Sequence, residues 1–122
     1  MYTALVLDKK SRQDLQKKFP PKYPDFIGHH ITLKFGVPKD TKKPSQPKTI
    51  EVVGHKDDGK GVEALVVAVN GKTQRPDGST YHITWSIDRS AGRKPVDSNK
   101  VLKGGFDKVE PTPIKISPEI LK

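Results

Sequence analysis

The sequence predicts a single α+β domain in which antiparallel strands outnumber helices. Three observations support this prediction. The chain has 122 residues, which is enough for one domain with a modest core. Several short segments alternate apolar and polar residues, the period of a half-buried strand. Turns rich in proline and glycine separate these segments, and only one clear helical pattern lies among them.

The first part of the chain is expected to form a strand, a short helix and a second strand. Residues 2–8 alternate, and their two leucines fall on the face opposite Tyr2. A helix is predicted over 11–18, with Ser11 as its N-cap, and the two prolines that follow end it. The next strand is predicted over 30–37, and a loop with two prolines follows it.

The rest of the chain is expected to add more strands. The predicted elements are strands at 49–55, 62–69 and 80–88, a weak helical turn at 97–102 and a final strand within 111–120. The first two should form a hairpin, because a glycine-containing turn joins them. A mobile polar loop is expected between the second and third. Three prolines favour an edge position for the last strand.

The charge of the chain favours anionic partners. Twenty-three Lys and Arg residues stand against fourteen Asp and Glu, which gives a net charge of +9. Such a field attracts nucleic acid, nucleotides or acidic surfaces, and the charge alone does not separate them. Solubility explains the same imbalance equally well.

The composition also excludes several classes of site. The absence of cysteine rules out disulfides, thiolate zinc sites and a cysteine nucleophile. No apolar run approaches the length of a membrane helix, and the N-terminus lacks the pattern of a signal peptide. We therefore expect a cytoplasmic protein without a membrane partner. No apolar stripe marks an interface, which favours a monomer.

A doubled motif carries most of the functional information. Residues 30–33 read HITL and residues 82–85 read HITW, so two of only four histidines precede Ile-Thr within predicted strands. Alternation places each histidine and its threonine together on the polar face, about 7 Å apart along the strand. Two such strands side by side would gather two imidazoles and two hydroxyls around a space that suits a phosphate.

This set of groups is suited to acid–base chemistry on a phosphodiester. One imidazole can accept a proton from the attacking oxygen while the other donates to the leaving oxygen. The hydroxyls and a nearby cation can hold the other phosphate oxygens. A bell-shaped rate profile between about pH 5 and 8 is therefore expected. Neither motif contains Asp or Glu, so we expect no metal and no cofactor.

The motif pair resembles the two H-x-T signatures of the two-histidine (2H) phosphoesterase superfamily, of the LigT-like or cyclic phosphodiesterase type. Among the members of this superfamily, the short viral or bacterial proteins are the most similar to this chain. If the protein is viral, its expected location is the cytoplasm of the host cell. The resemblance implies a compact two-lobed α+β fold whose antiparallel sheets line a central groove. It also implies that His30 and His82 are the catalytic acid–base pair and that Thr32 and Thr84 bind phosphate. The chain departs from the family in its short spacing between motifs, which suggests that a helix of one lobe is reduced.

Six further residues are candidate substrate contacts: Lys34, Ser86, Tyr2, Tyr81, Lys72 and Arg75. Lys34 and Ser86 continue the two motif faces, although a solvated side chain is an equal alternative at both. The Tyr2 ring can stack on a base, and the hydroxyl of the tyrosine before His82 can reach the groove, although core packing suits both rings. Lys72 and Arg75 lie in a basic loop that can fold over a polyanionic substrate. The alternative is that the charged side chains of this loop are only solvated.

The remaining histidines and aromatic residues have simpler expected roles. His29 falls on the opposite strand face from His30 and is expected to be a surface or structural residue. His55 is expected to be solvated in a polar turn. Trp85 and Phe35 alternate away from the motif side chains and are expected in the core.

Three interpretations of the function remain open. The first is a metal-independent phosphodiesterase that acts on 2′,3′-cyclic phosphates at RNA ends or on cyclic oligonucleotides. The alternative is a non-catalytic basic module that binds RNA or nucleotides with the same groove. A weaker third interpretation is a basic interaction protein with incidental histidines. A second complete motif favours the enzyme, because binding alone does not need a matched acid and base.

Overall fold

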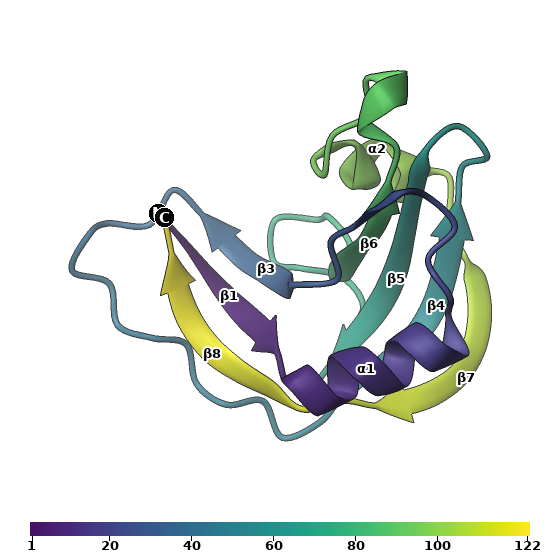
Figure 1. Cartoon of the computed structure of the whole chain (residues 1–122). Helices are drawn as coiled ribbons and strands as arrows, with labels where there is room; N and C mark the ends of the chain where they lie inside the picture. Colours follow the sequence, from purple (N-terminus) through teal and green to yellow (C-terminus); the bar gives the residue numbers. More distant parts are fainter.

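The computed structural model describes residues 1–122 as one eight-stranded antiparallel sheet with two α-helices (Figure 1). The elements in chain order are β1 (Tyr2–Leu7), α1 (Lys9–Lys18), β2 (Asp25–Phe26), β3 (His30–Phe35), β4 (Ile50–Asp57), β5 (Val62–Val69), β6 (His82–Ile87), a 3-10 turn (Arg89–Ala91), α2 (Asp97–Lys103), β7 (Asp107–Pro113) and β8 (Ile116–Leu121). The strand order is β7-β4-β5-β6-β3-β1-β8, and β2 pairs with β6. The α+β prediction is confirmed, as is the β4–β5 hairpin.

Helix α1 begins two residues before the predicted start at Ser11. The N-cap is Asp8, whose carboxylate accepts hydrogen bonds from the backbone N–H groups of Lys10 and Ser11 at 3.1 and 3.5 Å. The Ser11 hydroxyl instead accepts from the backbone N–H of Lys115 at 2.8 Å. The prediction of Ser11 as the cap was therefore wrong, because an earlier carboxylate satisfies the free N–H groups of the first turn.

The C-terminal tail forms two strands where one was predicted. β7 pairs with β4 and β8 pairs with β1, so the tail supplies both outer strands of the sheet (Figure 1). Both strands contain proline, which removes a backbone donor and is tolerated where one side of a strand is unpaired. The predicted edge position is confirmed for β8, and β7, which was not predicted as a separate strand, forms the other edge.

The two faces of the sheet are covered differently. On one face, Leu15 of α1 joins the main apolar cluster with Ile31, Leu65 and Ile83 from three neighbouring strands. Trp85 belongs to the same cluster, as predicted, and its indole N–H donates to the Phe19 carbonyl at 2.8 Å. On the other face, Leu102 of α2 packs against Ala64 and Val66 of β5. The motif side chains therefore share their face with α2.

Gly28 controls how the chain enters β3. Its φ of +45° is unfavourable for other residues, and an added Cβ would lie 2.6 Å from the Phe26 ring and 2.9 Å from the Trp85 ring. We expect Gly28→Ala to lower the free energy of unfolding by about 3 kcal/mol, at the upper end of what backbone strain costs, because the ring contacts add to it. Urea unfolding followed by tryptophan fluorescence measures this change.

Gly36 is the matched control for Gly28. Its φ is +67°, but an added Cβ would meet nothing within 4 Å. Gly36→Ala should therefore carry only the backbone cost of about 1 kcal/mol. Equal losses in the two variants would show that the ring contacts around Gly28 do not matter.

Candidate functional site

The two H-x-T motifs lie on neighbouring strands. β3 and β6 pair in antiparallel register at Ile31 and Ile83, which are the central residues of the two motifs. Antiparallel register about this pair sets each histidine across from the threonine of the other motif. Only this residue pair joins the two strands, and they diverge beyond it (Figure 1).

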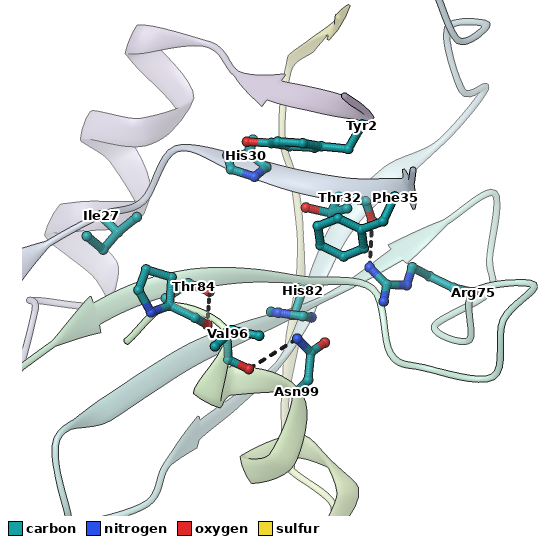
Figure 2. A pocket seen from close by; sticks show the side chains of 11 residues that line it. Tyr2, Ile27, His30, Thr32, Phe35, Arg75, His82, Thr84, Val96 and Asn99 are labelled. Carbon is teal, nitrogen blue, oxygen red and sulfur yellow. Dashed lines mark hydrogen bonds between the residues drawn. The ribbon is translucent and has the colours of Figure 1, made fainter. Parts of the chain in front are cut away.

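A groove of about 360 Å³ lies over this junction (Figure 2). Its lining residues are Tyr2, Ile27, His30, Thr32, Phe35, Arg75, His82, Thr84, Pro95, Val96 and Asn99. All four motif side chains are among them, so the structure brings the two histidines and the two threonines of the motifs together. The volume is within the range of small-molecule binding sites.

The tautomer of neutral His82 is fixed by a backbone carbonyl. Nδ1 of His82 lies 2.7 Å from the carbonyl oxygen of Thr80. A carbonyl only accepts, so Nδ1–H is the donor, and Nε2 of the neutral ring carries a free lone pair. Burial lowers the pKa of His82, the Thr80 hydrogen bond opposes this effect, and the positive charge of Arg75 adds to the lowering. His82 is therefore a neutral proton acceptor at neutral pH.

His30 is also neutral at neutral pH. Burial, with smaller contributions from His29 and His82, lowers the pKa of His30 to about 4. The Tyr2 ring lies beside it at 5.4 Å between ring centroids. Nδ1 of His30 lies 2.9 Å from Nδ1 of His29, so one ring donates to the other. His29 is exposed, as expected for a surface residue, but its ring contacts His30 although strand alternation predicted separate faces.

The two threonine hydroxyls are placed differently. Thr32 lines the groove on β3, and its backbone carbonyl accepts from the Arg75 guanidinium at 3.2 Å (Figure 2). The Thr84 hydroxyl donates to the Pro95 carbonyl at 3.3 Å and lies 2.9 Å from the hydroxyl of the buried Ser98. The bond to Pro95 is long, so a phosphate oxygen can replace that acceptor at little cost.

Arg75 is the cation of the groove. Its side chain is only 5% exposed, and it donates to the Thr32 carbonyl and to the Ser79 hydroxyl. Its ion pair with Asp77 spans 3.3 Å. The loop predicted to be mobile thus holds its arginine in place, and Arg75 lines the groove together with the four motif side chains.

A β-bulge changes which residues of β3 face the groove. Thr3 pairs with Lys34 and Ala4 pairs with Thr32, so Leu33 has no partner on β1. The extra residue reverses the alternation that follows it. Lys34 is therefore exposed outside the groove.

The same bulge turns Phe35 into the groove lining. The Phe35 ring is 56% exposed and lies 5.6 Å from the Tyr2 ring. The prediction of Phe35 as a core residue was wrong for this reason. Tyr2 lines the groove on the face that alternation predicted.

Three other candidate contacts lie outside the groove. Ser86 is fully buried and donates to Glu63 at 2.6 Å, because the segment before β2 covers this end of β6. Tyr81 packs against the main apolar cluster. Lys72 is exposed at the turn after β5. Their side chains have structural or surface positions.

His55 is not solvated as predicted. Its Nε2 lies 2.7 Å from the Glu63 carboxylate, and its ring stacks on Phe19 at 5.8 Å between centroids. The turn predicted to hold His55 is part of strand β4, which faces β5 directly. His55 therefore completes a buried hydrogen-bond network in which Glu63 is the central acceptor.

Several lining residues had no signal in the sequence. Ile27 precedes β3, Pro95 and Val96 come from the turn into α2, and Asn99 lies in α2 itself. The Asn99 amide donates to the Val96 carbonyl at 3.2 Å (Figure 2). Pro95, Val96 and Asn99 enter the site because α2 packs against the motif face of the sheet, which a local pattern does not predict.

No family model, curated protein or solved structure matches the chain. Neither helix is long and apolar enough to span a membrane. No group of three or more Asp, Glu or His side chains is arranged to hold a metal ion.

Proposed function

We propose that the protein is a metal-independent phosphodiesterase of the 2H type that hydrolyses 2′,3′-cyclic phosphates at RNA ends or in cyclic oligonucleotides. The observation that carries this proposal is the convergence of both H-x-T pairs on one groove. Two strands that meet at one residue pair and diverge beyond it also support the two-lobed arrangement that the family resemblance implies. The basic net charge suits an anionic substrate in the cytoplasm.

His82 is the general base in this proposal. Nδ1–H of His82 is committed to the Thr80 carbonyl, so Nε2 is the nitrogen of this groove-lining ring that keeps a free lone pair. Nε2 accepts a proton from water as the new oxygen–phosphorus bond forms. His30 supplies the proton that the leaving ribose oxygen takes as the other phosphorus–oxygen bond breaks. Water is thereby added across one phosphodiester bond, and no cofactor takes part.

Three groups hold the phosphate. The hydroxyls of Thr32 and Thr84 donate to its non-bridging oxygens, and the Arg75 guanidinium balances their charge. The Thr84 hydroxyl exchanges its long bond to the Pro95 carbonyl for a stronger charged acceptor.

The nucleotide base has a place beside these groups. The rings of Tyr2 and Phe35 lie next to each other on the groove wall, and the Arg75 guanidinium lies 5.7 Å from the Phe35 ring. Exposed aromatic rings are surfaces on which bases stack. The groove therefore favours a phosphodiester that carries a nucleobase over a simple phosphate ester.

The acid limb of the pH profile follows from the pKa of His82. The lowered pKa keeps His82 neutral at a pH where an ordinary histidine is protonated. Protonation of His82 in the free protein removes the base and lowers kcat/KM. Because the pKa of His82 is lowered, we expect this fall only below pH 6.5. Initial rates from pH 4 to 9 at low substrate concentration measure this limb. A midpoint above pH 6.5 would contradict the assignment of His82 as the base.

The proposal is tested with a substrate panel in EDTA. The panel contains 2′,3′-cyclic mononucleotides, short RNA ending in a cyclic phosphate, and cyclic dinucleotides. We expect hydrolysis of at least one class at a rate that added Mg²⁺, Mn²⁺ or Zn²⁺ leaves unchanged. A rate that is lost in EDTA and restored by metal would overturn the metal-free mechanism.

The alternative is a binding module that uses the same groove without turnover. Such a module would also bind its ligand through the Arg75 charge and the rings of Tyr2 and Phe35. Binding alone, however, does not require that the free nitrogen of His82 is fixed as a proton acceptor. Binding of the panel without any product would favour this alternative.

A further inference from the structure

His29 offers a second, unassigned imidazole to the proposed active site. Its Nδ1 lies 2.9 Å from Nδ1 of His30, and the two rings meet edge to face with centroids 5.1 Å apart. His29 is exposed to solvent, while His30 lines the groove. A continuous hydrogen-bonded path therefore runs from bulk water through His29 to His30.

The direction of the hydrogen bond follows from where a proton is stable. Burial disfavours the charged form of His30 and lowers its pKa to about 4, so a positive charge is unfavourable on this ring of the pair. Whenever His29 carries the proton instead, both of its ring nitrogens bear N–H, so Nδ1–H of His29 must donate. Nδ1 of neutral His30 is then the acceptor, and the single proton of His30 is on Nε2. The other titratable and charged groups around His30 are Tyr2 on β1, His82 on β6 and Arg75 in the loop before it.

A chemical problem makes this contact important. A neutral imidazole that gives up its only proton becomes an imidazolate anion, which is far too basic to form at a useful rate. His30 can therefore act as an acid at neutral pH only if a proton arrives on Nδ1 as the Nε2 proton leaves. His29 is the group in contact with Nδ1.

We propose that His29 is a positioning and proton-relay residue that holds His30 as the Nε2–H tautomer and passes a proton to its Nδ1 during turnover. This inference rests on the proposed function. The Nε2 proton of His30 goes to the leaving ribose oxygen, and the Nδ1 proton of His29 goes to Nδ1 of His30, so both rings end neutral. After the product leaves, solvent returns a proton to Nε2 of His30, and the Nδ1 proton returns to His29.

Two variants separate relay from positioning. His29→Ala removes both functions, whereas His29→Asn places an amide N–H near the position of Nδ1 and preserves only the hydrogen bond. We expect both variants to lose about tenfold to hundredfold in kcat at pH 7, because His30 must then be protonated before it can act. The loss should be smaller at pH 5, where more of the buried His30 is charged. Added imidazole should restore part of the activity of His29→Ala.

Failure of the His29 relay and failure of the proposed phosphodiesterase give different results. Full activity in His29→Asn, or equal losses at pH 5 and pH 7, would overturn the relay. Lys34→Ala, an exposed substitution on the same strand and outside the groove, serves as the control and should match the wild type. If the wild type hydrolyses no substrate of the panel, the proposed phosphodiesterase function itself is wrong.

A measurement without substrate tests the hydrogen bond directly. The ¹⁵N chemical shifts of the histidine rings near pH 6 report which nitrogen of His30 is protonated. We expect Nε2–H and an acceptor Nδ1 in the wild type, and a mixture of tautomers in His29→Ala. Protonation of His30 at Nδ1 in the wild type would overturn the inference whatever the activity.

Discussion

Alanine at His82 should reduce kcat for the preferred phosphodiester by about 10²–10⁴-fold, the range that one general base contributes. The lone pair on Nε2 is the group lost, because Nδ1 of His82 is committed to the Thr80 carbonyl. Alanine at His30 should cause a loss of similar size, because the leaving oxygen then lacks its proton donor. Single-turnover rates with enzyme in excess measure both losses without the influence of product release.

Binding distinguishes a catalytic loss from a folding loss in these variants. The phosphate contacts of Thr32, Thr84 and Arg75 remain, so the Kd for uncleaved substrate should change by less than about fivefold, or about 1 kcal/mol. Full activity in either histidine variant would remove that residue from the mechanism. Lys34→Ala is again the control, because its side chain is exposed beside the groove.

Alanine at Glu63 should lower the free energy of unfolding by about 3–5 kcal/mol, the cost of breaking a buried charged network. The Glu63 carboxylate is 1% exposed and accepts from His55, Ser86 and the backbone N–H of Lys22. These bonds join β4, β5, β6 and the segment before β2, so their loss leaves several buried polar groups unpaired. Guanidinium unfolding at pH 7 measures the change.

Glu63→Gln is the matched variant, because it keeps the size of the side chain and one of its acceptor oxygens. Burial alone would raise the pKa of Glu63, but hydrogen bonds from His55 and Ser86 outweigh it and leave the pKa below its ordinary value. A carboxyl with a lowered folded pKa contributes stability above about pH 4.5 that is lost on further acidification. The wild type should therefore lose stability below that pH more steeply than Glu63→Gln. Equal slopes would show that the Glu63 charge does not contribute.

Much of the site could be predicted because it depends on local patterns. Successive side chains of a strand point to opposite faces, so His30 and Thr32, which are two residues apart, are expected on the same face from the sequence alone. The burial of Trp85 follows for the same reason. A second copy of the motif on another strand then predicts one site formed by both strands. This prediction does not depend on how the chain folds between the two copies.

The remaining features depend on irregularities that have no local signature. The bulge at Leu33 exchanges the positions of Lys34 and Phe35, and it arises from pairing with β1 and not from the residues of β3 themselves. The contact of His29 with His30 arises because β3 begins at His30, so strand alternation does not extend back to His29.

The fold shows the same division between local and long-range information. The hairpin is formed by adjacent segments and was predicted. The separation of the tail into β7 and β8, on opposite edges of the sheet, depends on which distant strands have free sides. The segment 95–99 reaches the groove by long-range packing of α2, which explains why Asn99 was missed.

The proposed function requires that the groove cleaves a phosphodiester and does not merely bind it. The most direct test follows a 2′,3′-cyclic nucleotide by ³¹P NMR with the wild-type protein in EDTA, beside the double variant His30→Ala/His82→Ala. We expect the cyclic phosphate signal to convert to a phosphomonoester with the wild type and to persist with the double variant, although both proteins bind the ligand. Binding by both proteins without conversion, for this ligand and for the rest of the panel, would rule out the proposed phosphodiesterase and identify a binding module instead.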